Sequence, residues 1–445
     1  MDSYSSLFMS YRSDVSDKAR QYVHGLMQAG NRKNMERMTE VVPDSNWQQL
    51  QQFASDSAWD RQAVIDQIGR DADSVIGDCR DACLALDESG FAKKGRCSAG
   101  VARQWLGRHG KVDNGQVGVF AALCNGTRGT LINERLFLPR EWTDDPERCL
   151  KAGIPREAIV RKTKQELALE MVHDARRLGV QYGWVAADAG YGHGLGFCVG
   201  LCEMGETFVV DCDCDQRVFL DDPAPYVPSK PQRKRGRKHV RAVTDAAATR
   251  VDSWAKSLPD RRWRTITVRQ GAKGLVEYEY VRKRVWVWEQ GSPQAFHWWL
   301  VVRRDPKTKG EYKFTLSNAG GETSLRRLAF MQGQRFWVER CFQDAKSECG
   351  MADYQVRKWR GWHSHMTLVM LSMLFMLHEK VYHQDDYPLL SCADVEDLLA
   401  HFLPRRDTTV DAVLSHLERR HEQRRRSIET ARVAPRKTHP STAPS

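Results

Sequence analysis

Two short apolar runs, each ending in an aspartate, restrict the fold of this chain more than any other feature. Residues 82–87 end in Asp87 with Gly90 close behind, and residues 183–188 end in Asp188, followed by Ala-Gly-Tyr-Gly. Runs of this length are typical of buried strands, and the glycines favour sharp turns directly after them. We therefore expect Asp87 and Asp188 at the exposed ends of two buried strands of an α/β protein.

A third acid lies late in the chain, in a segment with helical periodicity. Arg335, Glu339, Phe342 and Lys346 are spaced by four, three and four residues, which places them on one face of a helix. A carboxylate between two bases suits a site that binds a metal cation beside phosphates. The same spacing is equally common on an exposed helix stabilised by ion pairs. The helix alone leaves both interpretations open.

The order of the expected elements brings the acids together. Strands are expected at 115–123 and 129–139, and a helix at 164–178 between the capping-box sequence Thr163-x-x-Glu166 and Gly179. Three strands, a helix and a strand ending in an acid are the order of a ribonuclease H-like core. A right-handed crossover places the fourth strand beside the first, and Asp188 near Asp87. Magnesium prefers such a sparse set of oxygen ligands.

The other regions are arranged around this core. We expect a helical N-terminal DNA-binding region at 1–72, the two parts of the core at 73–220 and 326–384, and a helical, basic tail at 385–445. A basic linker and a β-rich insertion fill 221–325. The expected N-terminal helices are 19–27, 34–41, 47–53 and 59–68; the expected insertion strands are 264–268, 275–280, 285–288, 296–303 and 312–316. Residues 366–377 are expected to form a buried helix, and the tail two short amphipathic helices.

The charge favours an anionic partner, nucleic acid first. The 445 residues contain 68 Lys and Arg against 57 Asp and Glu, a net charge of +11. The run 230–241 holds seven bases and no acid, among them Arg233, Lys234 and Arg235. We expect this linker to be disordered or to become ordered on DNA. The triplet 32–34 (Arg-Lys-Asn) is equally consistent with a phosphate contact and with a solvated turn.

The cysteines and the N-terminus indicate the compartment. None of the twelve cysteines forms a C-x2-C pair, and Cys212 and Cys214 alternate with aspartates. Free, reduced thiols are expected, with a metal role the minor alternative. No secretory signal is visible, so a cytoplasmic protein is expected.

With the acids placed, the chain resembles a DDE transposase of a bacterial insertion sequence, of the branch with a β-strand insertion before the last acid. The signature of that branch, Y-x2-R-x3-E-x6-K, is matched by Arg335, Glu339 and Lys346, whereas Gln332 stands at the tyrosine position. The similarity covers roughly residues 20–378 and is closest to the insertion-sequence family numbered seven-hundred-and-one. The other matching segments are 86–95, 98–107, 114–118, 136–145, 187–192 and 359–365.

The resemblance implies a function and a set of site residues. Asp87, Asp188 and Glu339 would hold two divalent metals, magnesium by default with manganese as a substitute. The protein would bind terminal inverted repeats, cut DNA and join the freed 3′ end to target DNA, as a homodimer on double-stranded DNA. It would act in the bacterial cytoplasm, associated with the nucleoid. Arg335 and Lys346 would neutralise phosphates near the metals.

Further residues are expected to contact DNA, and for most of them a structural role is the alternative. Lys93 and Lys94 are expected to grip the flanking strand unless they belong to a solvated hairpin. Trp298 or Trp299 is expected to stack on a flipped base, although tryptophans on strands are more often core residues. Arg103 and His193 are further candidates, and His363 and His365 are as consistent with a structural role as with DNA contact.

Two other functions remain open from the sequence. A nuclease on the same core would share the three acids but would cut without joining. A non-catalytic, transposase-derived repressor would bind DNA only, and the presence of all three acids weighs against it.

Overall fold

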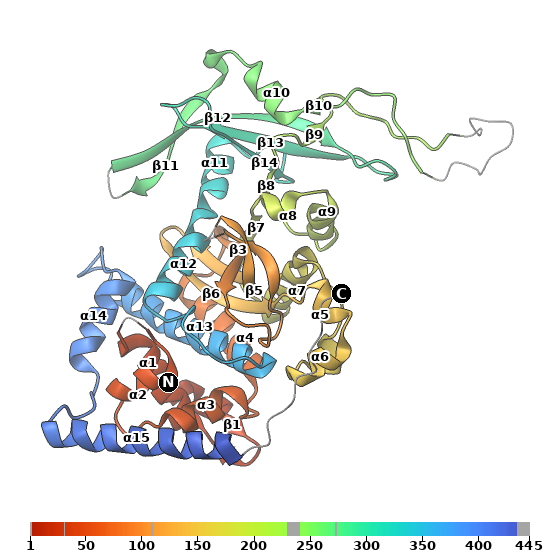
Figure 1. Cartoon of the computed structure of the whole chain (residues 1–445). Coiled ribbons are helices and arrows are strands. Elements are labelled where there is room, and N and C mark those ends of the chain that lie inside the picture. The colour runs from red at the N-terminus through yellow and green to blue at the C-terminus, as the bar shows by residue number, and fades with distance from the viewer. Residues whose placement is uncertain (1, 31, 108–109, 229–240, 272–273, 434–445) are drawn as a thin grey trace.

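The computed structural model describes residues 2–433 except 31, 108–109, 229–240 and 272–273 (Figure 1). A mixed, ten-stranded sheet in the order β11-β12-β13-β14-β8-β7-β3-β5-β4, with β6 also paired to β5, runs through the α/β molecule. The basic residues Arg233, Lys234 and Arg235 lie outside the described residues.

The elements have the following bounds. The strands are β1 (Met9–Ser10), β2 (Ser13–Asp14), β3 (Asp78–Ala92), β4 (Ala102–Leu106), β5 (Lys111–Asn125), β6 (Arg128–Leu136), β7 (Tyr182–Ala187), β8 (Phe208–Cys212), β9 (Arg217–Val218), β10 (Thr249–Arg250), β11 (Arg264–Gly271), β12 (Gly274–Val287), β13 (Phe296–Arg304) and β14 (Tyr312–Ser317). The helices are α1 (Ser16–Gln28), α2 (Met35–Val41), α3 (Trp47–Ser55), α4 (Arg61–Ile76), α5 (Arg140–Thr143), α6 (Pro146–Lys151), α7 (Lys164–Leu178), α8 (Ala189–Gly192), α9 (Gly196–Glu203), α10 (Val251–Lys256), α11 (Leu325–Gln334), α12 (Phe336–Ser347), α13 (Trp359–Tyr382), α14 (Cys392–Phe402) and α15 (Val410–Val433).

The centre of the sheet has the order β6-β5-β3-β7-β8. Strand β5 is antiparallel to both β3 and β6, whereas β7 is parallel to β3 and β8 is parallel to β7. The sequence predicts that the first and fourth core strands, β3 and β7, are adjacent. This prediction is confirmed, because Leu86 of β3 pairs with Ala187 of β7. Asp87 and Asp188 directly follow these paired residues and therefore lie at the same level of the sheet.

The expectation that Asp87 ends its strand is wrong. Strand β3 continues to Ala92, because its pairing with β5 extends from Asp87 opposite Phe120 to Ala92 opposite Gly115. Gly90 therefore does not form a turn. A Cβ atom at this position would lie 2.7 Å from Cδ2 of Leu106, so the glycine allows β3 and β4 to approach closely.

Helix α7 has its predicted bounds and caps. Thr163 accepts a hydrogen bond from the backbone N–H of Glu166, and the Glu166 carboxylate accepts one from the backbone N–H of Thr163. Gly179 ends the helix with a φ of 79°, in the left-handed region that glycine adopts without strain. Both ends of α7 are thus determined by local sequence.

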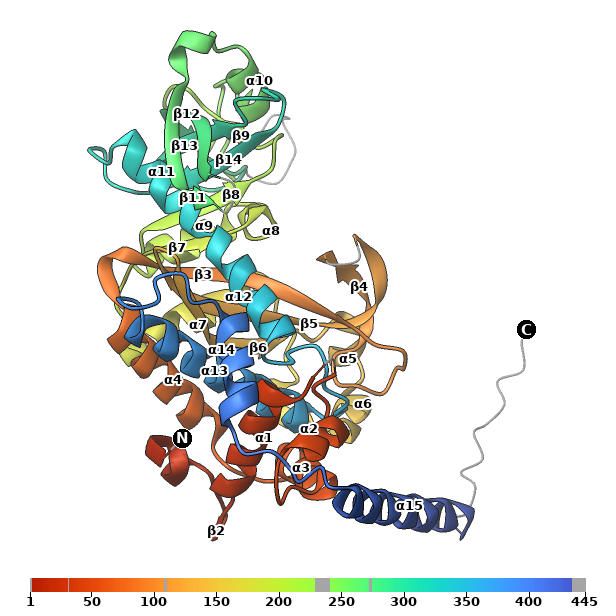
Figure 2. The same ribbon diagram turned by 90° about the vertical axis from the view of Figure 1, so that its left-hand side faces the viewer.

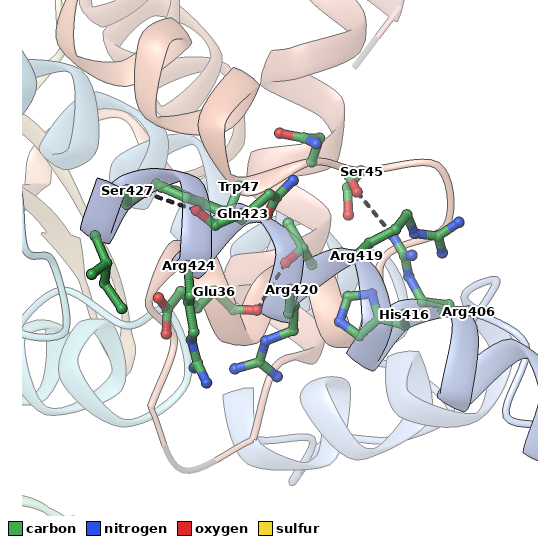
Figure 3. A pocket seen from close by; sticks show the side chains of 13 residues that line it. Glu36, Ser45, Trp47, Arg406, His416, Arg419, Arg420, Gln423, Arg424 and Ser427 are labelled. Atoms are coloured by element: carbon green, nitrogen blue, oxygen red, sulfur yellow. Dashed lines mark hydrogen bonds between the residues drawn. The ribbon is translucent and has the colours of Figure 1, made fainter. Parts of the chain in front are cut away.

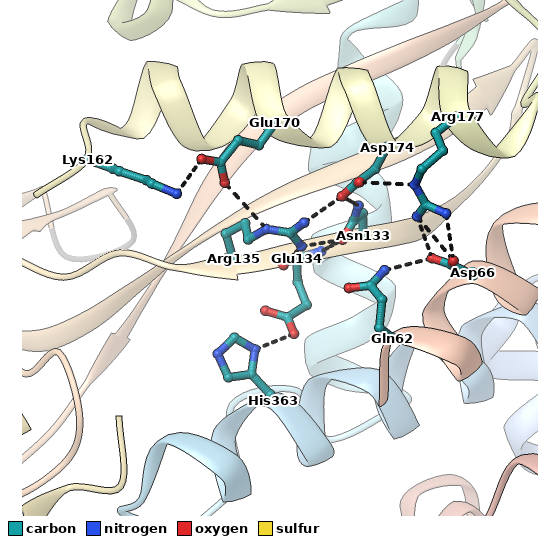
Figure 4. A network of polar contacts seen from close by, with 10 residues as sticks. All are labelled: Gln62, Asp66, Asn133, Glu134, Arg135, Lys162, Glu170, Asp174, Arg177 and His363. Carbon is teal, nitrogen blue, oxygen red and sulfur yellow. Dashed lines mark hydrogen bonds and ion pairs between the residues drawn. The ribbon is translucent and has the colours of Figure 1, made fainter. Parts of the chain in front are cut away.

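Two neighbouring residues of β6, Glu134 and Arg135, connect the sheet to helices on its two faces (Figure 4). Arg135 forms an ion pair of 2.5 Å with Asp174 of α7. The intervening Glu134 is buried and lies 2.6 Å from Nδ1 of His363 on α13. Neighbouring residues of a strand point to opposite faces. The sheet is therefore enclosed between α7 on one face and α13, with α4 beside it, on the other.

The N-terminal segment forms four α-helices at the expected places, and they pack against the rest of the molecule. The fourth, α4, extends to Ile76, beyond its expected end at residue 68. Tyr22 of α1 and Trp59 belong to the same hydrophobic core as the central strands. The sequence predicts that the triplet 32–34 is either a phosphate contact or a solvated turn, and Lys33 is neither. It is only 4% exposed and lies 2.5 Å from the carboxylate of Glu396. Asn34 caps α2.

The β-rich insertion extends the same sheet, because β14 pairs with β8. The two strands expected at 275–280 and 285–288 are one continuous strand, β12. The intervening residues, such as Val281 opposite Val302 and Arg284 opposite Trp299, remain paired with β13 and leave no break.

The C-terminal region begins with the expected buried helix, which extends over α13 and buries residues such as Met366 and Leu374. The prediction of two short tail helices is wrong for the second, since α15 is 24 residues long. Figure 2 shows α15 projecting from the body next to the N-terminal helices. Within the described part of the chain, no helix is long and apolar enough to cross a membrane. All twelve cysteines are free in the described structure.

Candidate active site

Three aspartates lie in a row across the three parallel strands of the core. Asp87 and Asp188 follow the pair Leu86 and Ala187, and Asp211 of β8 follows Val210, which pairs with the same Ala187. Asp87 and Asp211 are buried, and Asp188 is half-buried. The side chain of Asp188 caps α8 by accepting a hydrogen bond of 3.0 Å from the backbone N–H of Gly190. Asp211 is the member of this row that the sequence analysis missed.

Arg335 connects this row to the third predicted acid. It lies between α11 and α12, with Nη1 3.3 Å from Asp87, Nε 3.3 Å from Asp211 and Nη2 2.7 Å from Glu339. Burial alone lowers the pKa of Arg335, but the surrounding carboxylates, Asp211 and Asp87 first, raise it above its ordinary value. The guanidinium is therefore a charged bridge between two buried aspartates and the exposed Glu339.

The carboxyl group of Asp87 is held in an environment that disfavours its charge. Burial raises the pKa of Asp87 to about 7, and the charge of Asp188 adds to the rise, while Arg335 opposes it. Two carboxylates at a buried site repel each other unless a cation lies between or beside them. A strongly shifted acid next to a second acid is the pattern typical of functional sites.

A buried network behind Asp211 fixes the position of Arg335. Asp211 accepts a hydrogen bond of 2.6 Å from Thr315 and lies 2.9 Å from Nζ of Lys313. Thr315 in turn accepts a hydrogen bond of 2.5 Å from Gln332, the residue at the tyrosine position of the signature. Gln332 is buried and bonds toward Asp211, not toward solvent. The sequence contained one signal for Asp211, an acid inside an otherwise apolar strand, where charges are rare unless paired.

A cavity of about 430 Å³ opens beside the aspartates. Asp87, Asp188 and Lys346 line it, together with Lys164, which forms an ion pair of 2.6 Å with Glu88. Trp105 of β4 also lines the cavity and is 55% exposed, which is unusual for a tryptophan. The sequence analysis included this tryptophan in the matching segment 98–107 but assigned it no role. The cavity thus combines acids, cations and an exposed aromatic surface.

The carboxylates suit a hard cation by their chemistry. Carboxylate oxygens are the ligands that Mg²⁺ prefers. Among the described residues, however, no three Asp, Glu, His or Cys side chains are grouped closely enough to hold a metal ion. The Glu339 carboxylate lies 2.7 Å from Nη2 of Arg335 instead.

The remaining expected DNA contacts lie elsewhere. Lys93 is half-buried, with Nζ 3.4 Å from the ring centre of Tyr354, and burial lowers its pKa to about 8. Lys94 and Arg103 are exposed. His193 is exposed and lies 3.0 Å from the carboxylate of Asp213. None of these four is among the described residues that line the cavity.

The aromatic and histidine candidates outside the cavity are mostly buried. Trp298 is 3% and Trp299 7% exposed, and Trp298 packs on Phe208 with the ring centres 5.0 Å apart. Their burial does not support the expected stacking on a flipped base. His365 is fully buried, with Nδ1 2.9 Å from the hydroxyl oxygen of Tyr22. His363 contacts Glu134 and His365 contacts Tyr22, so both histidines make the contacts of a structural role, not those of DNA binding.

Comparison with known proteins gives two matches. The DDE superfamily endonuclease profile matches residues 6–275, more than half of the chain, including Asp87 and Asp188. A protein of Microchaete diplosiphon, described as a probable transposase for insertion sequence element IS701, is 26% identical over 364 residues. That match covers 79% of this chain and 80% of the relative. By its sequence, this chain belongs to the DDE superfamily endonuclease family.

Proposed function

We propose that this protein is a transposase that binds the terminal inverted repeats of an insertion sequence, cuts the DNA there and joins the freed 3′ end to target DNA. One observation carries the proposal. Asp87 and Asp188 lie level on adjacent parallel strands beside a cavity, and Arg335 connects Glu339 to the same row. These are the three acids expected to do the chemistry.

The proposal includes a ribonuclease H-like core. The strand order β6-β5-β3-β7-β8 supports it, with β5 antiparallel to both neighbours and the crossover helix α7 between β6 and β7. In this arrangement the insertion at 221–325 separates the helix of Glu339 from the two aspartate strands.

Asp87, Asp188 and Glu339 would hold the divalent metal ions, magnesium first and manganese as a substitute. The raised pKa of Asp87 supports this assignment, because a neighbouring cation would stabilise its anionic form. Glu339 would bind a metal together with Asp87 and Asp188 only after its ion pair with Arg335 is broken. Bound metal would polarise the scissile phosphate and activate the attacking oxygen.

The protein's own side chains would position the DNA and neutralise its charge. Lys346 and Lys164 line the cavity, where they would contact phosphates beside the aspartates. Once Glu339 is released, Arg335 carries a charge that can pair with a phosphate while Asp211 still holds its Nε. In-line displacement at phosphorus depends mainly on such positioning. We expect the protein to act as a homodimer on paired DNA ends in the cytoplasm, at the nucleoid.

The test is cleavage and strand transfer on labelled DNA carrying the element's own terminal repeat, with and without magnesium. Wild type is compared with Glu339→Gln and with Glu322→Gln, an exposed acid outside the site. Cutting and joining by wild type and Glu322→Gln, lost in Glu339→Gln, is the expected result. Cutting without joining would identify a nuclease. Binding without cutting in all three proteins would identify a repressor and refute the catalytic proposal.

A further inference from the structure

A second cavity, of about 390 Å³, lies between the N-terminal helices α2 and α3 and the C-terminal helix α15 (Figure 3). Its wall combines segments from the two ends of the chain. Trp47 of α3 donates a hydrogen bond of 2.9 Å to Gln423 of α15, and Arg420 of α15 lies 2.9 Å from Glu40 of α2. These contacts fix α15 over the N-terminal helices and keep the cavity formed.

The cavity is strongly basic. Four arginines line it, and Glu36 is the one acid among its described lining residues. The arginines are Arg406, Arg419, Arg420 and Arg424. Arg406 donates to the backbone carbonyls of Val42 and Ser45, which carry no net charge. Neither Arg419 nor Arg424 forms an ion pair with any residue that the structure describes. Within the described part of the chain, three of the four arginines therefore form no ion pair with a carboxylate.

The lining groups also contain unused hydrogen-bonding capacity. Nε of Arg406 and Nε2 of His416 are buried and have no hydrogen-bond partner among the described atoms. Burial lowers the pKa of His416, and the charges of Arg406, Arg420 and Arg419 lower it further. Cations that repel each other around buried, unused donors make a site that an anion would stabilise.

The position of the cavity suits a long anion. Helices α2, α3 and α15, which carry most of its lining residues, lie at the opposite end of the molecule from the insertion strands β11 to β14 (Figures 1 and 2). Arg425 and Arg426 are exposed and continue the row of bases along α15. Arginines along an exposed helix contact successive phosphates of a nucleic acid backbone without reading its sequence.

We propose that this cavity is a phosphate-binding site for the DNA backbone, separate from the active site, with Arg419 and Arg424 as its principal contacts. The ligand is a phosphodiester of double-stranded DNA, and the inference rests on the proposed action on DNA. The site would hold the duplex to the N-terminal helices and α15 while another part of the same DNA lies at the aspartates.

The test measures DNA affinity by fluorescence anisotropy in EDTA, so that no cleavage occurs, over a series of salt concentrations. The double variant Arg419→Ala/Arg424→Ala is compared with wild type and with Arg156→Ala/Arg161→Ala. The control removes two exposed arginines that lie outside the N-terminal helices and line neither cavity. Loss of two phosphate contacts should reduce the slope of log K against log salt by about 2, for any DNA sequence. The control should keep the wild-type slope.

A second arm distinguishes DNA from free phosphate. Thermal unfolding is followed with increasing inorganic phosphate, using sulfate-free chloride buffer at constant ionic strength. One outcome would assign the cavity to a small phosphate compound and overturn the proposal: phosphate raises the Tm of wild type but not of the double variant, while the double variant binds DNA as tightly as wild type. An unchanged salt slope in the double variant would overturn it as well.

These outcomes are independent of the catalytic test. If wild type binds DNA through Arg419 and Arg424 but does not cut, the site proposal stands and the catalytic proposal fails. If wild type cuts and joins DNA but the double variant keeps the wild-type salt slope, the catalytic proposal stands and the site proposal fails. Both substituted arginines are exposed on α15, and circular dichroism checks that the variants keep their helices.

Discussion

Nε of Arg335 lies 3.3 Å from the carboxylate of Asp211, and this contact fixes a guanidinium that also reaches Asp87 and Glu339. Asp211 is 3% exposed and is itself held by Lys313 and Thr315 on the neighbouring strand. A carboxylate so placed orients the arginine without contacting the cavity. Asp211 is therefore a positioning residue of the site.

Asp211→Asn should slow DNA cleavage with little change in DNA affinity. The amide can still accept the hydrogen bond from Thr315, but the charge that holds Arg335 is lost. Removing a partner that orients a site residue typically costs about tenfold or more in activity. Single-turnover cleavage and binding in EDTA measure the two effects separately. Asp213→Asn, on an exposed neighbour, is the control; an equal loss in both variants would contradict the positioning role.

Gly192→Ala should destabilise the protein strongly. A Cβ atom at Gly192 would lie 2.0 Å from the backbone oxygen of Asp211, so α8 and β8 would have to separate. Such overpacking costs about 1–3 kcal/mol or more of the free energy of unfolding. Gly196→Ala is the matched control, because nothing lies within 4 Å of its Cβ position. Urea denaturation should show a loss for the first variant and no loss for the second.

Trp105→Ala should weaken DNA binding. The exposed indole lies in the wall of the cavity that contains Asp87 and Asp188, where a nucleobase can stack on it. The loss should be about 1–3 kcal/mol for one stacked base. Trp105→Phe should retain most of the affinity, and Tyr382→Ala, on an exposed aromatic that does not line the cavity, should retain all of it. Anisotropy titrations in EDTA measure the three; equal affinities would rule out stacking.

The protein should lose stability in mild acid through His365. Burial lowers the pKa of His365 to about 3, whereas an unfolded histidine has a pKa of about 6.5. Between these values the unfolded chain binds the extra proton, so the free energy of unfolding falls as the pH decreases from 6.5 toward 3. The loss from this group is about 2 kcal/mol between pH 7 and pH 5.

Denaturation at several pH values checks this dependence. His365→Gln removes the titrating group, so its stability should change less between pH 7 and pH 5 than that of wild type. His378→Gln, on an exposed histidine of the same helix, should follow wild type. The assignment to His365 is refuted if the His365→Gln protein loses as much stability as wild type.

The sequence by itself determined the features that depend on neighbouring residues or on chain direction. The capping box at Thr163 and the glycine at 179 set the ends of α7, because a helix cap needs partners only three or four residues away. The adjacency of Asp87 and Asp188 follows from the handedness of the crossover between parallel strands. Both predictions are confirmed.

Only the tertiary structure decided how those elements meet distant segments. Strand β3 runs past Asp87 because β5 continues to pair with it, and the periodicity of β3 contains no information about that partner. Lys93 is drawn to Tyr354, more than 250 residues away, and Lys33 to Glu396. Asp211 acquires its role from Lys313, Thr315 and Arg335, all about 100 or more residues later. Burial and ion pairing depend on long-range packing, which a local sequence pattern does not specify.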